Sequence, residues 1–163
     1  MNDQDNKVSP MKILIVDDTP ANIDVLRKFM AESGYDISIA PNGNIALKII
    51  DQSKPNLILL DVMMPGIDGF EVCRRLKKKD DTKDIPVIFV TAKTETSDIV
   101  EGFQAGGVDY IAKPFKREEV LSRVQTHLQI QNLIQKQAKL NEHLLSKNDE
   151  LIEAENQYRL IID

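Results

Sequence analysis

Short apolar runs recur along the chain, and each of them ends on a polar residue. Four such runs cover residues 13–16, 57–60, 87–90 and 108–112. The polar residues that follow them are Asp17 and Asp18, Asp61, Thr91, and Lys113. Short aliphatic runs of this kind, bounded by turn-forming residues, are typical of strands that are buried on both faces of a sheet. We therefore expect strands whose ends carry chemically useful side chains.

Strand patterns alternate with helix patterns five times between about residues 12 and 123. This alternation predicts a parallel sheet with helices on both faces. Asn42 and Asp68 stand where the second and third helices should begin, and Thr94 or Thr96 precedes the fourth. Right-handed connections of ordinary length give five such strands the order 2-1-3-4-5. The predicted fold class is therefore α/β, with a doubly wound five-stranded parallel sheet.

The last third of the chain has a different pattern. Residues 116–158 contain no proline and no glycine, so one extended helix can run through them. Its first turns carry an apolar stripe that should pack against the sheet and complete the domain. The stripe consists of Val120, Leu121, Val124 and Leu128.

Beyond this stripe, apolar residues recur at heptad spacing. Eight of ten seam positions are apolar when Ile130, Gln137, Leu144, Leu151 and Tyr158 take position a and Leu133, Leu140, Lys147, Ala154 and Ile161 take position d. The repeat favours a coiled coil over a solvated helix, because a lone polar helix is marginal in water. Lys147 interrupts the seam, and Glu150 would face Glu155 of a parallel partner. We therefore expect a homodimer through this helix that is weak or switchable.

Composition narrows the class of protein. The chain has 163 residues, of which 42% are hydrophobic, and this is enough for one core and an extension. We expect a flexible tail at 1–10, a globular domain at 11–128 and a coiled-coil helix at 129–163. One cysteine, Cys73, and two separated histidines exclude a disulfide framework and a Cys/His metal cluster.

Charge and hydropathy exclude further classes. The net charge of −5 argues against a nucleic-acid-binding surface. No apolar run approaches the roughly 20 residues of a bilayer span, and the polar first residues lack the pattern of a secretory signal. We expect a cytoplasmic protein without a nucleic-acid or membrane partner.

Because parallel strands align their carboxyl ends, the polar residues there should meet at one edge of the sheet. Asp17, Asp18 and Asp61 would crowd three negative charges, which a hard divalent cation such as Mg²⁺ stabilises. Thr91 would add a hydroxyl group and Lys113 an ammonium group, a set typical of phosphoryl transfer. An aspartate can itself be the nucleophile. The alternative is that the acidic pair and Thr91 merely cap the helices that follow them.

Four segments, in this order, closely resemble the receiver domains of two-component response regulators. They are residues 12–18 (KILIVDD), 60–69 (LDVMMPGIDG), 90–92 (VTA) and 109–115 (DYIAKPF). The resemblance covers about residues 11–128 and implies a CheY-like, flavodoxin-like fold. It also implies a partner, either a sensor histidine kinase or a histidine phosphotransfer protein, whose phosphohistidine supplies a phosphoryl group.

The resemblance implies a role for each acidic residue. Asp61 is the implied phospho-acceptor, and Asp18 and Asp61 are implied to bind Mg²⁺ directly. The backbone carbonyl of Met63 would be a third ligand, and Asp17 would hold the metal through water.

The resemblance also implies a switch. Thr91 and Lys113 would hold the phosphoryl oxygens, and the Lys113-Pro114 peptide bond is usually cis in this family. Tyr110 occupies the position of an aromatic residue that moves inward when the threonine moves toward the phosphate. The change would then pass to the face formed by the fourth helix, the fifth strand and the fifth helix. The alternative for Tyr110 is an ordinary aromatic residue at the edge of the sheet.

The chain departs from the family pattern at few positions. Gly106-Gly107 stands where relatives commonly have Gly-Ala. Met63 and Lys93 occupy positions that tune the phosphoryl lifetime in relatives.

Three functions remain open at this point. The first is a signalling receiver, not itself an enzyme, that acts through a dimeric C-terminal helix on an output domain outside this sequence. That domain would be a diguanylate cyclase, a hybrid histidine kinase or a sensor domain, and the apolar, uncapped end at 160–162 suggests such a continuation. The second is a stand-alone receiver that serves as a scaffold or phosphate sink. The third is a Mg²⁺-dependent aspartyl-phosphate phosphohydrolase, which usually needs an acid where this chain has Met63.

Overall fold

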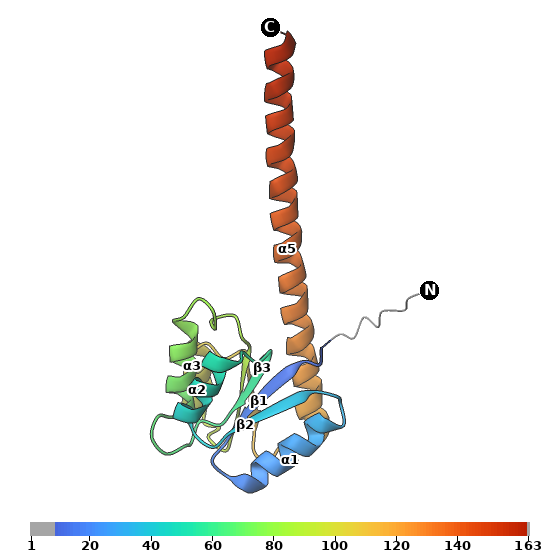
Figure 1. Cartoon of the computed structure of the whole chain (residues 1–163). Helices are drawn as coiled ribbons and strands as arrows, with labels where there is room; N and C mark the ends of the chain where they lie inside the picture. Colours follow the sequence, from blue (N-terminus) through green and yellow to red (C-terminus); the bar gives the residue numbers. More distant parts are fainter. Residues whose placement is uncertain (1–8, 163) are drawn as a thin grey trace, which may run out of the picture. The chain divides into compact units, whose positions relative to one another are not determined.

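The computed structural model describes residues 9–162, in which five strands alternate with five helices (Figure 1). The strands are β1 (Lys12–Val16), β2 (Asp36–Ala40), β3 (Leu57–Leu60), β4 (Val87–Thr91) and β5 (Asp109–Ala112). They form one parallel sheet in the order β2-β1-β3-β4-β5. The predicted fold class and strand order are therefore confirmed. The predicted tail lies outside the described residues, except for Ser9 and Pro10.

The register brings the carboxyl ends of the strands together. Val16 pairs with Leu60, Leu60 with Phe89, and Thr91 with Ala112. The residues that follow β1, β3 and β5 therefore emerge at one edge of the sheet, close to Thr91 at the end of β4.

Helices cover both faces of the sheet (Figure 1). On one face, α1 (Pro20–Ala31) and the start of α5 (Arg117–Ile162) pack against alternate strand residues such as Ile13 and Ile15. On the other face, α2 (Gly43–Gln52) and α3 (Gly69–Lys77) contribute to the core around Leu14 and Phe89. The single cysteine, Cys73, lies in this second core, where burial raises the pKa of its thiol to about 11.

At two of the predicted helix starts, the side chain of the expected N-cap residue accepts a backbone hydrogen bond. Asn42 Oδ1 accepts a hydrogen bond from the N–H of Ile45 at 2.9 Å, and Asp68 Oδ1 accepts one from the N–H of Glu71 at 2.9 Å. The fourth helix, α4 (Thr96–Gln104), differs from the expectation, because Glu95 is its N-cap residue and makes no side-chain cap bond. Asp98, in the first turn of α4, forms an ion pair with Lys93 that is described below.

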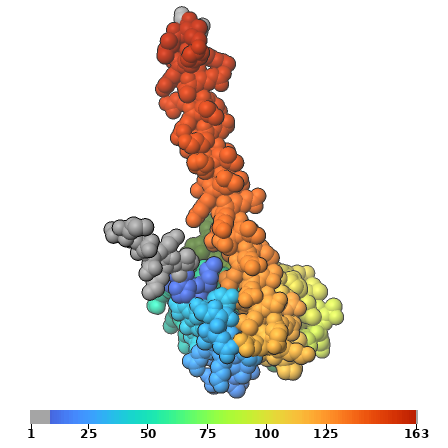
Figure 2. All heavy atoms as spheres, turned by 90° about the vertical axis from the view of Figure 1, so that its right-hand side faces the viewer, coloured from blue at the N-terminus to red at the C-terminus, as the bar shows by residue number. Residues whose placement is uncertain are grey.

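The first turns of helix α5 belong to the core of the domain. Val120, Val124 and Leu128 are buried in the core, and Leu121 packs against it, as the apolar stripe predicts. Contacts within the chain define two units, Met1–Leu128 and Gln129–Asp163. Nearly all described residues of the second unit are exposed (Figure 2), including large apolar side chains. No helix in residues 9–162 combines the length and hydropathy needed to cross a bilayer.

Strand β5 and helix α5 are joined by a polar cluster around Asp109. Asp109 Oδ1 accepts hydrogen bonds from Arg123 at 2.7 Å and from the N–H of Tyr110 at 2.8 Å. Its Oδ2 lies 2.9 Å from Nε2 of His127. Burial alone would raise the pKa of Asp109, but together these hydrogen bonds lower it below its ordinary value. His127 therefore has a structural partner, and Asp109 is held as a carboxylate.

The lowered pKa of Asp109 predicts a pH-dependent contribution to stability. A group whose pKa is depressed on folding stabilises the protein above its unfolded pKa, and this contribution is lost as the pH falls through the folded value. Asp109→Asn should lower the free energy of unfolding by about 1–2 kcal/mol at pH 5, and the difference from wild type should shrink by pH 3. Denaturant titrations at both pH values test this, with Asp80→Asn as a control, because the Asp80 side chain is fully exposed. A difference that stays constant down to pH 3 would contradict it.

Candidate functional site

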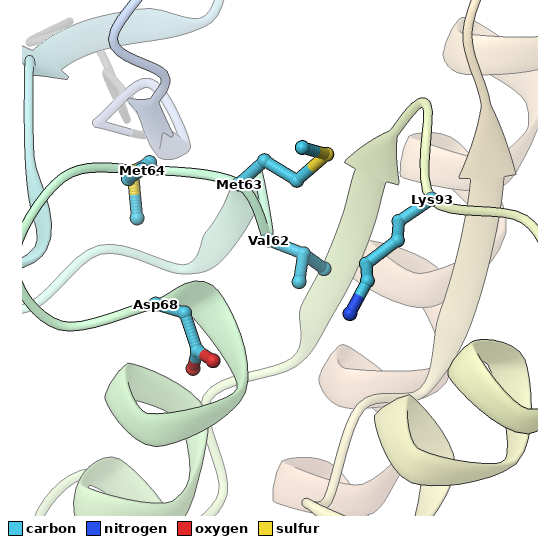
Figure 3. Close-up of a pocket in the computed structure, with 5 residues that line it drawn as sticks. All are labelled: Val62, Met63, Met64, Asp68 and Lys93. Atoms are coloured by element: carbon cyan, nitrogen blue, oxygen red, sulfur yellow. The ribbon is translucent and has the colours of Figure 1, made fainter.

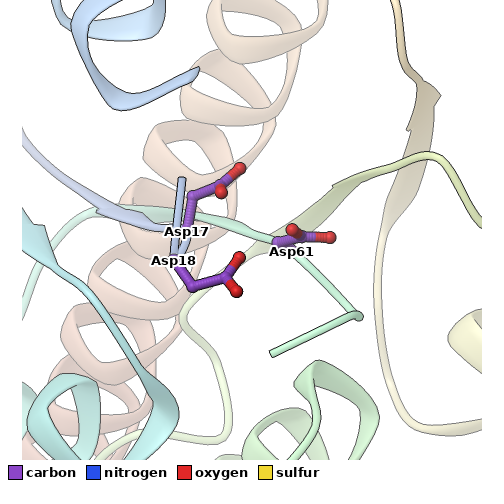
Figure 4. Close-up of side chains that lie close together, drawn as sticks. All are labelled: Asp17, Asp18 and Asp61. Carbon is purple, nitrogen blue, oxygen red and sulfur yellow. The ribbon is translucent and has the colours of Figure 1, made fainter. Parts of the chain in front are cut away.

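Three aspartates converge at the carboxyl edge of the sheet. Asp17 and Asp18 follow β1, and Asp61 follows β3. One carboxylate oxygen from each lies within 4.8 Å of the other two, and Figure 4 shows the three side chains gathered around one space. Asp17 and Asp61 are buried, with exposed fractions of 1% and 4%, whereas Asp18 is exposed.

Lys113 supplies the counter-charge. Its ammonium donates hydrogen bonds to Asp17 Oδ2 at 2.8 Å and to Asp61 Oδ2 at 3.0 Å. Burial alone would lower the pKa of Lys113, but the bonds to the two carboxylates raise it above its ordinary value. The peptide bond from Lys113 to Pro114 is cis. Three carboxylates and one ammonium leave a formal charge of −2 at the site (−3 + 1).

The remaining carboxylate oxygens differ in how they are bonded. Asp17 Oδ1 accepts a hydrogen bond from the N–H of Thr19 at 2.8 Å, so both oxygens of Asp17 have donors. Asp61 Oδ1 accepts a weaker bond from the N–H of Met63 at 3.2 Å. Within residues 9–162, no ion pair reaches Asp18. Carboxylate oxygens are the ligands that Mg²⁺ prefers, and one or two carboxylates suffice to hold this ion. The net negative charge of the site also fits a divalent cation.

The turn after Asp61 is held by the first residue of α3. The N–H of Gly69 donates to the carbonyl of Val62 at 3.0 Å. A Cβ atom at Gly69 would lie 2.2 Å from the backbone carbonyl oxygen of Asp61, so a side chain there would displace the strand end. The close packing of the first residue of α3 against the backbone of Asp61 therefore fixes the position from which the Asp61 side chain extends.

A second group of residues links β4 to β5. Thr91 is fully buried, and its Oγ1 accepts a hydrogen bond from the N–H of Lys93 at 3.2 Å. The hydroxyl of Tyr110 donates to the backbone carbonyl of Lys93. Burial, followed by the charges of Asp98, Asp61 and Glu101, raises the pKa of Tyr110 to about 12, so this hydroxyl remains a donor. Thr91 and Tyr110 are therefore bonded to the same residue.

A depression of about 390 Å³ opens on the turn that follows Asp61 (Figure 3). It is lined by Val62, Met63, Met64, Asp68 and Lys93. Met63 is largely exposed there, so this turn is accessible from solvent.

The structure thus brings Asp17, Asp18, Asp61 and Lys113 into one site and joins Thr91 to Tyr110 through Lys93. The predicted seam residues Ile130, Leu133, Leu140, Leu144 and Leu151 are exposed in the single chain. No sequence pattern indicated Asp98, a buried acid in the first turn of α4 that pairs with Lys93. The only available signal was an acidic residue near a helix start, and such residues are common.

Comparison with known protein families gives one match that covers most of the chain. The profile of the response regulator receiver domain matches residues 13–125. The DNA-binding dual master transcriptional regulator RpaA of Synechocystis is 41% identical over 133 residues, which are 82% of this chain and 55% of RpaA. The response regulator MprA of Mycolicibacterium vanbaalenii is 42% identical over 119 residues, which are 73% of this chain and 51% of MprA. The chain spans about half the length of these curated relatives.

Solved structures agree with the family match. A putative response regulator from Chloroflexus aurantiacus is 37% identical, with a TM-score of 0.71, and the match covers 73% of this chain and 98% of that one. The signal receiver domain of a signal transduction histidine kinase from Syntrophus aciditrophicus is 36% identical, with a TM-score of 0.69, and the match covers 73% of this chain and 90% of that one.

Proposed function

The chain belongs to the response regulator receiver family, and we propose that it accepts a phosphoryl group on Asp61 from a phosphohistidine. The donor would be a sensor histidine kinase or a histidine phosphotransfer protein. The observation that carries this proposal is the convergence of three carboxylates and the Lys113 ammonium at one sheet edge. The chain would act as a signalling receiver and not as an enzyme.

The transfer itself needs little chemistry from the protein. A carboxylate oxygen of Asp61 would form a bond to phosphorus while the bond from phosphorus to the donor's imidazole nitrogen breaks, and the electron pair leaves with that nitrogen. Lys113 lies 3.0 Å from Asp61, so its ammonium would neutralise the phosphoryl oxygens. Thr91 Oγ1 already accepts a bond from the N–H of Lys93, which leaves its own proton free for a phosphoryl oxygen.

Mg²⁺ would be held by Asp18, Asp61 and the backbone carbonyl of Met63. When bound, it would neutralise the crowded carboxylates and the incoming phosphoryl charge. Asp17, whose two oxygens accept bonds at 2.8 Å from the N–H of Thr19 and from Lys113, would reach it through water.

Phosphate uptake should depend on Mg²⁺. With a small radiolabelled acyl phosphate as donor, we expect about one base-labile phosphate per chain with Mg²⁺ and background incorporation with a chelator. The lability of the label identifies the acceptor, since acyl phosphates resist acid and are cleaved by base. An acid-labile, base-stable label would instead place the phosphate on His127 or His143 and overturn the proposal.

The output of the receiver is proposed as a change in pairing of the C-terminal helix. Phosphorylation would change the Tyr110 face, and a dimer through the exposed seam would carry the change to an output domain such as a diguanylate cyclase, hybrid histidine kinase or sensor domain. RpaA is a DNA-binding regulator, whereas the Syntrophus receiver belongs to a histidine kinase, so receivers of this kind serve different outputs.

The two other functions lack supporting observations. A phosphohydrolase would need an acid two residues after the nucleophile, and Met63 offers only a thioether there. A scaffold or phosphate sink would leave the apolar seam of the second unit without a role in signalling.

A further inference from the structure

Lys93 is bonded at three points, each leading to a different part of the domain. Its N–H donates to Thr91 Oγ1 at 3.2 Å, and its carbonyl accepts a hydrogen bond from the hydroxyl of Tyr110. Its ammonium lies 3.3 Å from Asp98 Oδ1, in the first turn of α4. It also lies 6.0 Å from the centre of the Phe70 ring. One residue therefore connects the buried threonine, the tyrosine of β5 and helix α4.

The Asp98 carboxylate needs a cation. Its side chain is only 11% exposed, whereas that of Lys93 is 46% exposed. Within residues 9–162, Lys93 is the one cation within 4.0 Å of this carboxylate. Loss of a partner from a mostly buried charge is more costly than loss from a surface pair. Loss of the ion pair should therefore cost more free energy at Asp98 than at Lys93.

The position of α4 determines the space available to Tyr110. A Cβ atom at Gly102, on the inner side of α4, would lie 3.1 Å from two ring atoms of Tyr110 and 3.2 Å from the Phe89 ring. The rings of Phe89 and Tyr110 are 5.9 Å apart. Because the Tyr110 ring lies against α4 at Gly102 and beside Phe89 of β4, a shift of α4 would change where that ring can lie.

We propose that the Lys93–Asp98 ion pair is a positioning element that fixes α4 against the turn after Thr91 and thereby holds Tyr110 on the Lys93 carbonyl. This inference rests on the proposed receiver function for its significance, but it concerns the unphosphorylated chain. Lys93 acts here through Asp98 and Tyr110, and it need not touch the phosphoryl group.

Incorporated 3-fluorotyrosine reports the state of Tyr110 directly. The chain has three tyrosines, so Tyr110→Phe assigns the fluorine NMR signal of Tyr110. In Lys93→Met, with neither metal nor phosphodonor present, we expect the population of the wild-type signal to fall about fivefold relative to a second state, as for a stabilisation of about 1 kcal/mol. Lys93→Arg should retain the wild-type signal, because it keeps the charge and the reach.

A double-mutant cycle distinguishes a role of the ion pair from independent roles of Lys93 and Asp98. Asp98→Asn should also lower the population of the wild-type signal. The double variant Lys93→Met/Asp98→Asn should lower this population no further than the larger of the two single effects. Lys54→Met is the matched control, because it breaks the Lys54–Asp81 pair, which is exposed and 3.1 Å long, and it should leave the Tyr110 signal unchanged.

The proposal would be overturned if the free-energy effects of the two single variants on this population added in the double variant. It would also be overturned by an unchanged Tyr110 signal in folded Lys93→Met. Thermal denaturation shows whether each variant is folded. If Lys93→Met does not fold, an unchanged Tyr110 signal in folded Asp98→Asn would overturn the proposal in its place. Since the measurement uses no phosphate, failure of Asp61 to take up phosphate would overturn the proposed function and leave this result standing.

Discussion

Asp61→Asn is expected to abolish base-labile phosphate uptake. The amide keeps the size of the side chain, so the close packing of Gly69 on the Asp61 carbonyl is retained. It lacks the anionic oxygen that would attack phosphorus. The other buried carboxylate of the site, Asp17, is held more closely than Asp61, with donors at 2.8 Å on both oxygens against 3.2 and 3.0 Å for Asp61. We expect incorporation from a small acyl phosphate with Mg²⁺ to fall to the level seen with a chelator.

Asp80→Asn serves as the control for this variant, because it makes the same change at a fully exposed side chain. It should take up phosphate as the wild type does. Undiminished incorporation in Asp61→Asn would move the acceptor elsewhere, and peptide mapping of the label would then show whether it is Asp18.

Leu140→Asp is expected to convert the proposed dimer into a monomer. The Leu140 side chain is 57% exposed in the single chain, and in a coiled coil it would be buried against the partner helix. An unpaired carboxylate in that seam costs at least about 2–3 kcal/mol for each chain, so association of two chains should weaken by a factor of about one thousand or more. Sedimentation equilibrium at micromolar concentration measures the change.

Gln135→Asp is the matched control, because it introduces the same side chain at an exposed position outside the seam. It should sediment as the wild type does. If Leu140→Asp keeps the wild-type mass, the dimer is formed by another surface or does not form, and the proposed route from the receiver to an output would be lost.

Local signals explain why the fold could be predicted. The aliphatic runs mark β1, β3 and β4, because both faces of these strands are buried. Asn42 and Asp68 mark helix starts, because each side chain bonds a backbone N–H three residues ahead. The meeting of Asp17 and Asp61 then follows from the parallel order of the strands alone.

Contacts that depend on tertiary geometry could not be predicted in this way. The pairing of Lys93 with Asp98 depends on how the turn after β4 meets α4, and the expected start of α4 at Thr94 or Thr96 missed the N-cap residue Glu95. His127 reads as an isolated histidine in the sequence, yet the fold places it 2.9 Å from Asp109. The seam of the second unit stays a prediction, because it concerns a second chain.

The burial of Cys73 makes this chain well suited to site-specific labelling. Thiol reagents attack the thiolate, and here the one native thiol is inaccessible and stays protonated at neutral pH. A cysteine introduced on an exposed helix position would therefore carry a spin label or fluorophore without prior removal of a native thiol. Distances between two labelled chains could then be measured before and after phosphodonor is added.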